Sequence, residues 1–355
     1  MERTEEIVMM LDQIPDPAFL VRDGIIYQCN QMAKSRQITE DTPIADLLAN
    51  DRETYDAYQD GILYLTLDLG WTVCGATVTK QGKDNLFLLD RDTDRAQLQA
   101  LALAAQQLRI PLSSIMNTGD LLFPQLDVDA QQDQAAQMRR SMFQLMRIIG
   151  NMADAERYAN NDTARMEQTE LNHFFQEIFE KSAAALESAG IQVVYSGLKA
   201  PVYTLVDRER MERAAMNLVS NAVKFSKSGD SIVVKLTCNG KAAALSVENP
   251  GENIPNHIRG TLFNRYMREP TLEDSRYGLG LGLTLVRSVA SAHGGTLLVD
   301  QPNGTRATMT VAIRKETTGT LRSPNLWIGD YSGGHDKVLL ELSDCLHWNA
   351  YKTDM

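Results

Sequence analysis

Two stretches of the chain carry apolar residues at the three- and four-residue spacing of helices that bury one face. In the first stretch these positions are Leu98, Leu101, Ala105, Leu108, Leu112, Ile115 and Leu122. In the second stretch they are Met138, Met142, Leu145, Ile148 or Ile149, and Met152. The spacing predicts two long helices joined by residues 123–127. Two helices alone cannot bury both seams, so we expect a homodimer in which two copies form a four-helix bundle.

The first predicted helix contains the segment Gln-Gln-Leu-Arg-Ile-Pro-Leu at residues 106–112. Gln106 follows Ala105, one step off the apolar seam, so its side chain is expected to face solvent. Pro111 lacks the amide that would bond to the carbonyl of Gln107, and it is expected to bend the helix. The amide nitrogen of Gln106 is not a nucleophile, because its lone pair is delocalised.

A second group of polar residues is predicted to lie on a helix at residues 207–227. Asn217, Asn221 and Lys224 are spaced i, i+4 and i+7, which places them on one helical face. Amide oxygens suit a hard cation such as Mg²⁺, and the ammonium suits the phosphates that Mg²⁺ accompanies. This face therefore predicts a site for a Mg²⁺-triphosphate.

A glycine-rich segment precedes another predicted helix, at residues 284–292. Gly278, Gly280 and Gly282 alternate with leucine, so the backbone there can approach a ligand closely. The amides and the dipole at the start of a helix favour an anion. The segment therefore predicts a phosphate-binding turn.

These motifs occur in the order found in sensor histidine kinases. Residues 217–226 resemble the N box of that family, residues 247–255 the G1 box, residues 262–268 the F box and residues 278–283 the G2 box. The resemblance implies an ATP-binding domain of the GHKL class, an α/β sandwich with ATP and Mg²⁺ as cofactors. It also implies that Asn221 is the Mg²⁺ ligand.

The G1-like segment departs from the family pattern at one position. Asn249 occupies the place of the aspartate that accepts a hydrogen bond from the adenine amino group, and Gly251 occupies that of the first glycine. An asparagine carbonyl can still accept this bond, but without charge assistance. We therefore expect weakened ATP affinity. In the lid that follows, Arg268 is a candidate phosphate contact.

Residues 106–112 resemble the phosphoacceptor box of the same family. Arg109, Pro111 and Leu112 match that box, whereas Gln106 replaces the histidine nucleophile and Gln107 replaces the acid that serves as general base. The resemblance thus predicts a histidine-kinase homologue that binds Mg-ATP and signals as a dimer but cannot autophosphorylate. Its partners would be a response regulator or a partner kinase.

Two other functions fit parts of the sequence. The chain can be an active kinase that phosphorylates a histidine on another chain, or a hydroxyl such as that of Ser113 or Ser114. A GHKL ATPase or chaperone without kinase history is disfavoured, since such enzymes place a catalytic glutamate where Asn217 stands. The pair of long helices also has no explanation in such a protein.

The remaining segments complete an α+β chain of several domains. Residues 1–92 are expected to form a small sheet with strands at 18–21, 25–27, 62–69, 72–80 and 85–89 and a helical middle, an order that resembles a PAS sensor domain. The helical pair is assigned to residues 93–160 and the ATP-binding domain to residues 161–315. The extension at residues 316–355 is apolar enough to pack on the ATP-binding domain or on a partner.

Composition limits the partners and the compartment. The formal charge of −11 disfavours binding to nucleic acid. The four cysteines are far apart in the sequence, which favours free thiols in a reducing compartment. No stretch approaches the roughly 20 apolar residues of a membrane span. We therefore expect a cytoplasmic protein.

Overall fold

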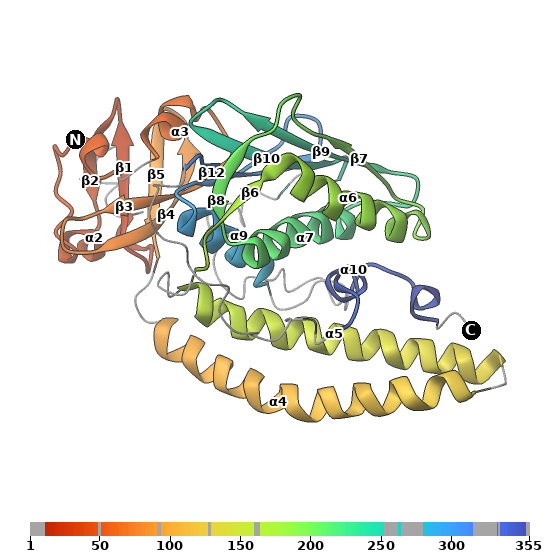
Figure 1. The fold of residues 1–355 in the computed structure, drawn as a ribbon. Coiled ribbons are helices and arrows are strands. Elements are labelled where there is room, and N and C mark those ends of the chain that lie inside the picture. The colour runs from red at the N-terminus through yellow and green to blue at the C-terminus, as the bar shows by residue number, and fades with distance from the viewer. Residues whose placement is uncertain are drawn as a thin grey trace.

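The computed structural model describes residues 11–48, 51–90, 94–126, 129–159, 164–251, 254, 262–263, 280–314, 332 and 334–352. A single ten-stranded sheet extends through most of the molecule, and three helices cover one face of its carboxy-terminal half (Figure 1). Two long helices lie below that helical layer. None of the helices within these ranges combines the length and the apolar character that crossing a membrane requires.

The amino-terminal half of the sheet contains five strands in the order β2-β1-β5-β4-β3. They are β1 (Ala18–Arg22), β2 (Ile25–Cys29), β3 (Ile62–Asp68), β4 (Val73–Gln81) and β5 (Asp84–Leu89). All five lie within about two residues of their predicted positions. The predicted helical middle consists of three short elements: α2 (Gln31–Ser35), the 3-10 turn η1 (Ile44–Asp46) and α3 (Arg52–Ala57).

The core beneath these strands is closed by aromatic side chains. Phe19 stacks on Phe87 with ring centroids 4.8 Å apart, and Tyr55 of α3 packs against Phe87 at 5.6 Å. Phe19 and Phe87 are fully buried. Apolar side chains therefore fill the space between the sheet and the short helices.

The two long helices are α4 (Asp94–Leu122) and α5 (Asp129–Ala159), joined through the 3-10 turn η2 (Phe123–Gln125). They pack along each other, and α5 lies between α4 and the rest of the molecule (Figure 1). Helix α4 continues through Pro111. It is bowed in Figure 1, as expected for a long helix that contains a proline.

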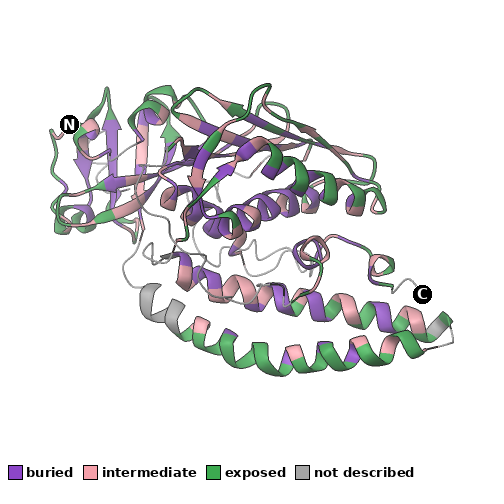
Figure 2. Ribbon diagram, in the orientation of Figure 1, coloured by how far each residue is buried: buried purple, intermediate pink, exposed green. Residues whose placement is uncertain are grey.

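The predicted seam of α4 is not buried as a unit. Ala105 and Leu112 are buried together with Met116, whereas Leu108 and Ile115 are about half exposed. Among the described residues of one chain, α5 packs along one side of α4, so alternate seam positions face away from α5. Figure 2 shows this largely exposed surface of α4.

Helix α5 divides its apolar positions in the same way. Met142 and Ile149 are buried, and so is Phe143, while Met138 and Leu145 are about half exposed. Among the described residues, one chain therefore buries only part of each predicted seam, which agrees with the expectation that two helices alone cannot bury both.

The carboxy-terminal half of the sheet has the order β11-β12-β10-β9-β7. These strands are β7 (Gln192–Ser196), β9 (Ser231–Cys238), β10 (Ala242–Asn249), β11 (Leu297–Asp300) and β12 (Thr305–Ala312). The helices on one face are α6 (Leu171–Glu187), α7 (Arg208–Lys224) and α9 (Gly282–Ala292). A separate two-stranded sheet pairs β6 (Glu167–Glu170) with β8 (Tyr203–Val206). This mixed sheet with helices on one face is the α/β sandwich that the resemblance implies.

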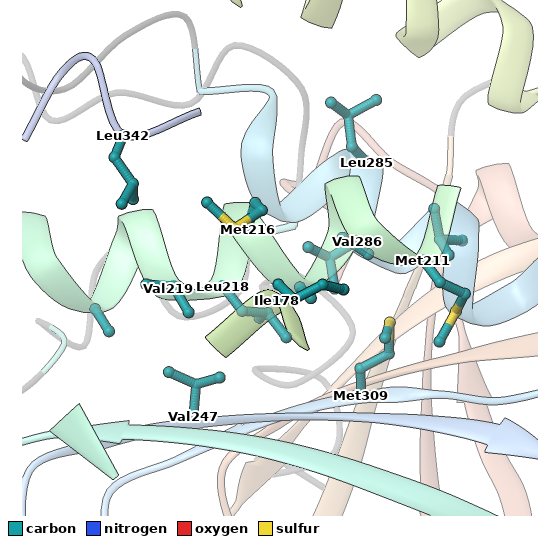
Figure 3. Close-up of a cluster of buried hydrophobic side chains, with 14 of the residues drawn as sticks. Ile178, Met211, Met216, Leu218, Val219, Val247, Leu285, Val286, Met309 and Leu342 are labelled. Carbon is teal, nitrogen blue, oxygen red and sulfur yellow. The ribbon is translucent and has the colours of Figure 1, made fainter. Parts of the chain in front are cut away.

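Helix α7 lies at the centre of this half, between two apolar layers. Figure 3 shows Leu218 and Val219 facing Val247 of the sheet, and Met216 on the opposite side facing Leu342. All of these side chains are almost completely buried. A helix with apolar contacts on both sides is fixed in position, so the polar residues that it carries are fixed as well.

The two halves of the sheet meet along β3 and β11, which pair antiparallel. Leu63 lies opposite Leu298, and Tyr64 lies opposite Leu297. Leu63 and Leu297 are fully buried. No local sequence pattern indicates that two edge strands more than 230 positions apart pair with each other.

The end of the chain lies between α5 and α7 (Figure 1). It contains α10 (Lys337–Glu341) and the 3-10 turn η5 (Trp348–Tyr351). Leu340, Leu342, Leu346 and Tyr351 are buried. Of the two alternatives expected for this extension, its described residues 334–352 pack on the protein itself, with α5, α6 and α7 as neighbours.

Candidate functional site

The candidate site is built on α7, which begins at Asp207. The Asp207 carboxylate accepts a hydrogen bond from the amide of Arg210 at 3.1 Å and so caps the helix. From this start, 3.6 residues per turn bring Asn217 and Asn221 to the side of α7 that faces the beginning of α9.

Asn217 is buried and has one unused polar atom. Its side-chain amide donates to the carbonyl of Arg213 at 2.9 Å, while Oδ1 has no hydrogen-bond partner among the described residues. A buried carbonyl oxygen without a partner is costly, because it has lost its hydrogen bonds to water. The atom therefore marks a place that suits a donor or a cation.

Gly282, the first residue of α9, lies against both asparagines. A Cβ atom at this position would be 3.1 Å from Oδ1 of Asn217 and 3.6 Å from the amide group of Asn221. Only glycine leaves the space beside these amides open. Gly280, two residues earlier, has a φ of +69°, a conformation that glycine adopts without strain.

The start of α9 has the features of an anion site. Leu281 precedes the helix and provides no side-chain cap. Among the described residues no side chain caps the first amides of this 11-residue helix, and the helix dipole favours negative charge at that end. The structure thus brings Asn217, Asn221 and Gly282 together. Gly278 and Arg268 lie outside the described residues.

Asn249 ends β10 and connects three segments. Its amide is satisfied when Nδ2 donates to the carbonyl of Thr305 at 3.2 Å and Oδ1 accepts from the amide of Gly251 at 3.1 Å. An aspartate could not donate to Thr305. Oδ1 keeps a second lone pair, so it can still accept a hydrogen bond from a ligand.

Lys224 does not extend into open solvent. Its Nζ lies 2.9 Å from Oδ2 of Asp344 in the carboxy-terminal segment, and its side chain is 8% exposed. Burial lowers the pKa of Lys224, because it disfavours the charged form. The ammonium that the sequence assigned to phosphate is therefore engaged by a carboxylate in this structure.

A buried network of charges surrounds this ion pair. Arg147 of α5 contacts Asp344 at 2.5 Å, Glu341 at 3.3 Å and the hydroxyl of Ser220 at 3.0 Å. Arg213 of α7 contacts the second oxygen of Glu341 at 3.1 Å. Arg213 also contacts Asp154 of α5 at 2.7 Å. The network thus connects α5, α7 and the carboxy-terminal segment.

Sequence reasoning missed these charged residues. Arg147 stands between methionine and isoleucine in an apolar stretch of α5, whereas Arg213 follows Glu212 in the charged first half of α7. Buried arginines are rarely tolerated without carboxylate partners. That requirement indicates buried partners, but it does not identify carboxylates more than 120 positions away in the sequence.

Gln106 and Gln107 lie apart from this site. Both side chains are exposed on α4, as predicted for Gln106. Helix α5 separates α4 from α7 (Figure 1). The structure therefore does not bring the two glutamines together with the asparagines of α7 within one chain.

The donor set fits a magnesium nucleotide better than a metal ion alone. Within the described ranges, no three His, Cys, Asp or Glu side chains gather in a metal-binding arrangement. Amide oxygens from Asn217 and Asn221 together with a helix start suit a cation that arrives with its own phosphate oxygens. Mg²⁺ is commonly bound in this way, through few protein ligands and several phosphate oxygens.

Known proteins resemble the chain in this region. Residues 206–316 match the family of histidine kinase-, DNA gyrase B- and HSP90-like ATPases. Hybrid signal transduction histidine kinase D of Dictyostelium discoideum is 25% identical over 226 residues, which are 61% of this chain and 14% of that protein. Sensor histidine kinase CusS of Escherichia coli is 28% identical over 214 residues, which are 58% of this chain and 44% of that protein.

A solved structure also overlaps the chain. The crystal structure of full-length ShkA in complex with AMPPNP aligns with this chain at 20% sequence identity and a TM-score of 0.49. The aligned part is 61% of this chain and 45% of the ShkA chain. The chain spans less than half the length of these relatives.

Proposed function

We propose that the chain binds Mg-ATP between α7 and the start of α9, because residues 206–316 match the family of histidine kinase-, DNA gyrase B- and HSP90-like ATPases. The observation that carries the proposal is the buried Oδ1 of Asn217, which lies beside Gly282 and has no hydrogen-bond partner in the described part of the chain. Relatives named as sensor histidine kinases support it.

In this proposal each group at the site has one role. Asn221 provides the protein oxygen for Mg²⁺, and Asn217 orients the ion or the water molecules around it. The amides at the start of α9, with Gly278, Gly280 and Gly282, hold the phosphates. Asn249 accepts a hydrogen bond from the adenine amino group beside Gly251, and Arg268 contacts phosphate. Bound Mg²⁺ would neutralise phosphate charge.

We further propose that the chain does not autophosphorylate. Gln106 stands in the acceptor position and Gln107 in the position of the general base, and an amide cannot replace either group. The chain would signal instead through nucleotide-dependent conformation, with a response regulator or a partner kinase as its target. The four free cysteines are compatible with a reducing, cytoplasmic location.

The architecture of the proposal has four parts. Residues 1–92 form a PAS-like sensor domain, which the strand order β2-β1-β5-β4-β3 supports. Residues 93–160 form the dimerisation hairpin, which the half-exposed apolar positions on α4 and α5 support. Residues 161–315 bind ATP, and residues 316–355 form an extension.

Isothermal titration with Mg-ATP tests the proposed site. We expect saturable binding by the wild-type chain and about tenfold or greater loss of affinity in Asn221→Ala, because a contact to a charged ligand is worth more than about 1.4 kcal/mol. Asn117→Ala on the exposed surface of α4 is the matched control and should bind like wild type. Absence of wild-type binding at millimolar Mg-ATP would refute the proposal.

A further inference from the structure

The carboxy-terminal segment at residues 335–352 is an integral part of the interface between α5 and α7. Helix α10 is capped by Asp336, whose carboxylate accepts from the amides of Val338 and Leu339. Leu340, Leu342, Leu346 and Tyr351 are buried, and Leu342 faces Met216 of α7 in Figure 3. Burial of this kind holds the segment in one position.

Charged contacts fix the same segment to both helices. Glu341 is fully buried and pairs with Arg147 of α5 and Arg213 of α7. Arg140 and Gln144 of α5 both donate to the carbonyl of Ser343, at 3.1 and 3.2 Å. Removal of the Glu341 carboxylate would leave the buried charges of Arg147 and Arg213 with fewer partners, which would strongly destabilise the fold.

Asp344 connects this anchored segment to the nucleotide site. One of its carboxylate oxygens, Oδ2, accepts from Arg147 at 2.5 Å and from Lys224 at 2.9 Å. Lys224 is the last residue of α7 and lies one turn beyond Asn221. The carboxylate therefore takes the cation that stands beside the proposed phosphate position.

We propose that Asp344 is a built-in competitor of the nucleotide phosphates for Lys224. The proposal rests on the proposed function. While Lys224 pairs with Asp344, the carboxy-terminal segment is held to α7 by this ion pair. When Mg-ATP binds, its phosphates take the Lys224 ammonium, and the ion pair with Asp344 is lost. A carboxylate and a phosphate are interchangeable partners for an ammonium, and the flexible lysine stem lets Nζ turn from one to the other.

The competition for Lys224 has a structural consequence, because Asp344 belongs to the buried charged network. The same oxygen of Asp344 serves Lys224 and Arg147, so loss of Lys224 changes the charge balance of the whole network. Since that network connects α7 to α5, nucleotide binding would loosen the ATP-binding unit from the long helices. Nucleotide binding beside α7 would thus affect the packing of α5 through a contiguous set of charged residues.

Two probes and two variants test the competition by isothermal titration. Mg-ATP carries phosphates, whereas adenosine has none. We expect Asp344→Asn to bind Mg-ATP about tenfold more tightly than wild type, since an amide is a weaker partner for the ammonium than a carboxylate. Adenosine affinity should not change. Asp133→Asn is the control, because it removes a surface contact of the segment, to Lys352, without reaching Lys224.

The outcomes separate this inference from the proposed function. If wild type binds neither probe, the proposed function fails and the inference with it. If wild type binds Mg-ATP but Asp344→Asn binds it equally or more weakly, only the inference fails, and Asp344 positions Lys224 instead of competing for it. Circular dichroism verifies that each variant is folded.

Hydrogen exchange provides a second measurement on the unaltered chain. If Mg-ATP breaks the ion pair between Lys224 and Asp344, the backbone amides of residues 338–346 should exchange faster in the presence of Mg-ATP. Adenosine should leave their rates unchanged. Unchanged or slower exchange with saturating Mg-ATP would overturn the proposal.

Discussion

His293 is buried at the end of α9, where both of its ring nitrogens have partners. Nδ1 lies 2.7 Å from the carbonyl of Val289, and Nε2 lies 2.9 Å from the amide of Asp207. These partners require a neutral ring with the proton on Nδ1. Through Asp207, the histidine of α9 holds the start of α7, the helix that carries the candidate site.

The stability of the fold should therefore depend on pH through His293. Burial lowers the pKa of His293 below its ordinary value of 6.5. The unfolded chain takes up the proton first, so the contribution is complete above pH 6.5 and is lost as the pH falls below it. We expect the free energy of unfolding in urea to fall by at most about 1.4 kcal/mol per pH unit from this group.

A variant isolates the contribution of His293 from that of the other titratable groups. The loss of stability between pH 7.5 and 5.5 should be smaller in His293→Gln than in wild type. His173→Gln replaces an exposed histidine of α6 and should keep the wild-type dependence. If the free energy of unfolding depended on pH equally in all three proteins, His293 would not contribute to that dependence.

At the scale of elements, the joint between the two halves of the sheet depends on Asp90. Its Oδ1 accepts from Arg287 of α9 at 2.8 Å, and its Oδ2 accepts from the hydroxyl of Tyr64 at 2.9 Å. Arg287 also lies over the Tyr64 ring, 4.7 Å from its centroid. The carboxylate thus ties β3 to α9 beside the pairing of β3 with β11.

Removal of this charge should weaken the joint. We expect Asp90→Asn to lower the free energy of unfolding by about 1–2 kcal/mol, because Arg287 is buried and loses a charged partner. Asp56→Asn, which alters an exposed ion pair on α3, should change it by less than about 0.5 kcal/mol. If urea unfolding gave Asp90→Asn the stability of wild type, the joint would not depend on this residue.

Local sequence patterns predicted the elements but not these long-range contacts. Alternating strands and the spacing of Asn217 and Asn221 depend on neighbours along the chain, so their positions could be predicted. The pairing of Tyr64 with Leu297 and that of Lys224 with Asp344 join residues 120 or more positions apart. Such contacts are selected by packing of the whole fold, and no local pattern encodes them.

At the scale of the whole molecule, the exposed apolar rows on the long helices predict the oligomeric state. Leu108, Ile115 and Leu122 recur every seven residues along α4, and Met138 and Leu145 do so along α5. Exposed rows of this kind are the seams of helical bundles. We therefore expect the chain to be a homodimer.

Light scattering coupled to size-exclusion chromatography measures the oligomeric state directly. Ile115→Glu combined with Leu145→Glu should convert the dimer to a monomer, because charged side chains are not tolerated in a buried seam. Asn117→Glu adds the same charge at a polar position of α4 and should remain dimeric. A dimer that survives the double substitution would place the interface elsewhere.

The central claim is that the chain keeps the site for Mg-ATP and lacks only the acceptor for its phosphate. Incubation with γ-labelled ATP tests both parts in one experiment. Wild type should acquire no label, Gln106→His combined with Gln107→Glu should acquire acid-labile label, and Asn221→Ala added to that pair should abolish it. Label on the wild-type chain, or none on the variant with both acceptor residues restored, would contradict the claim.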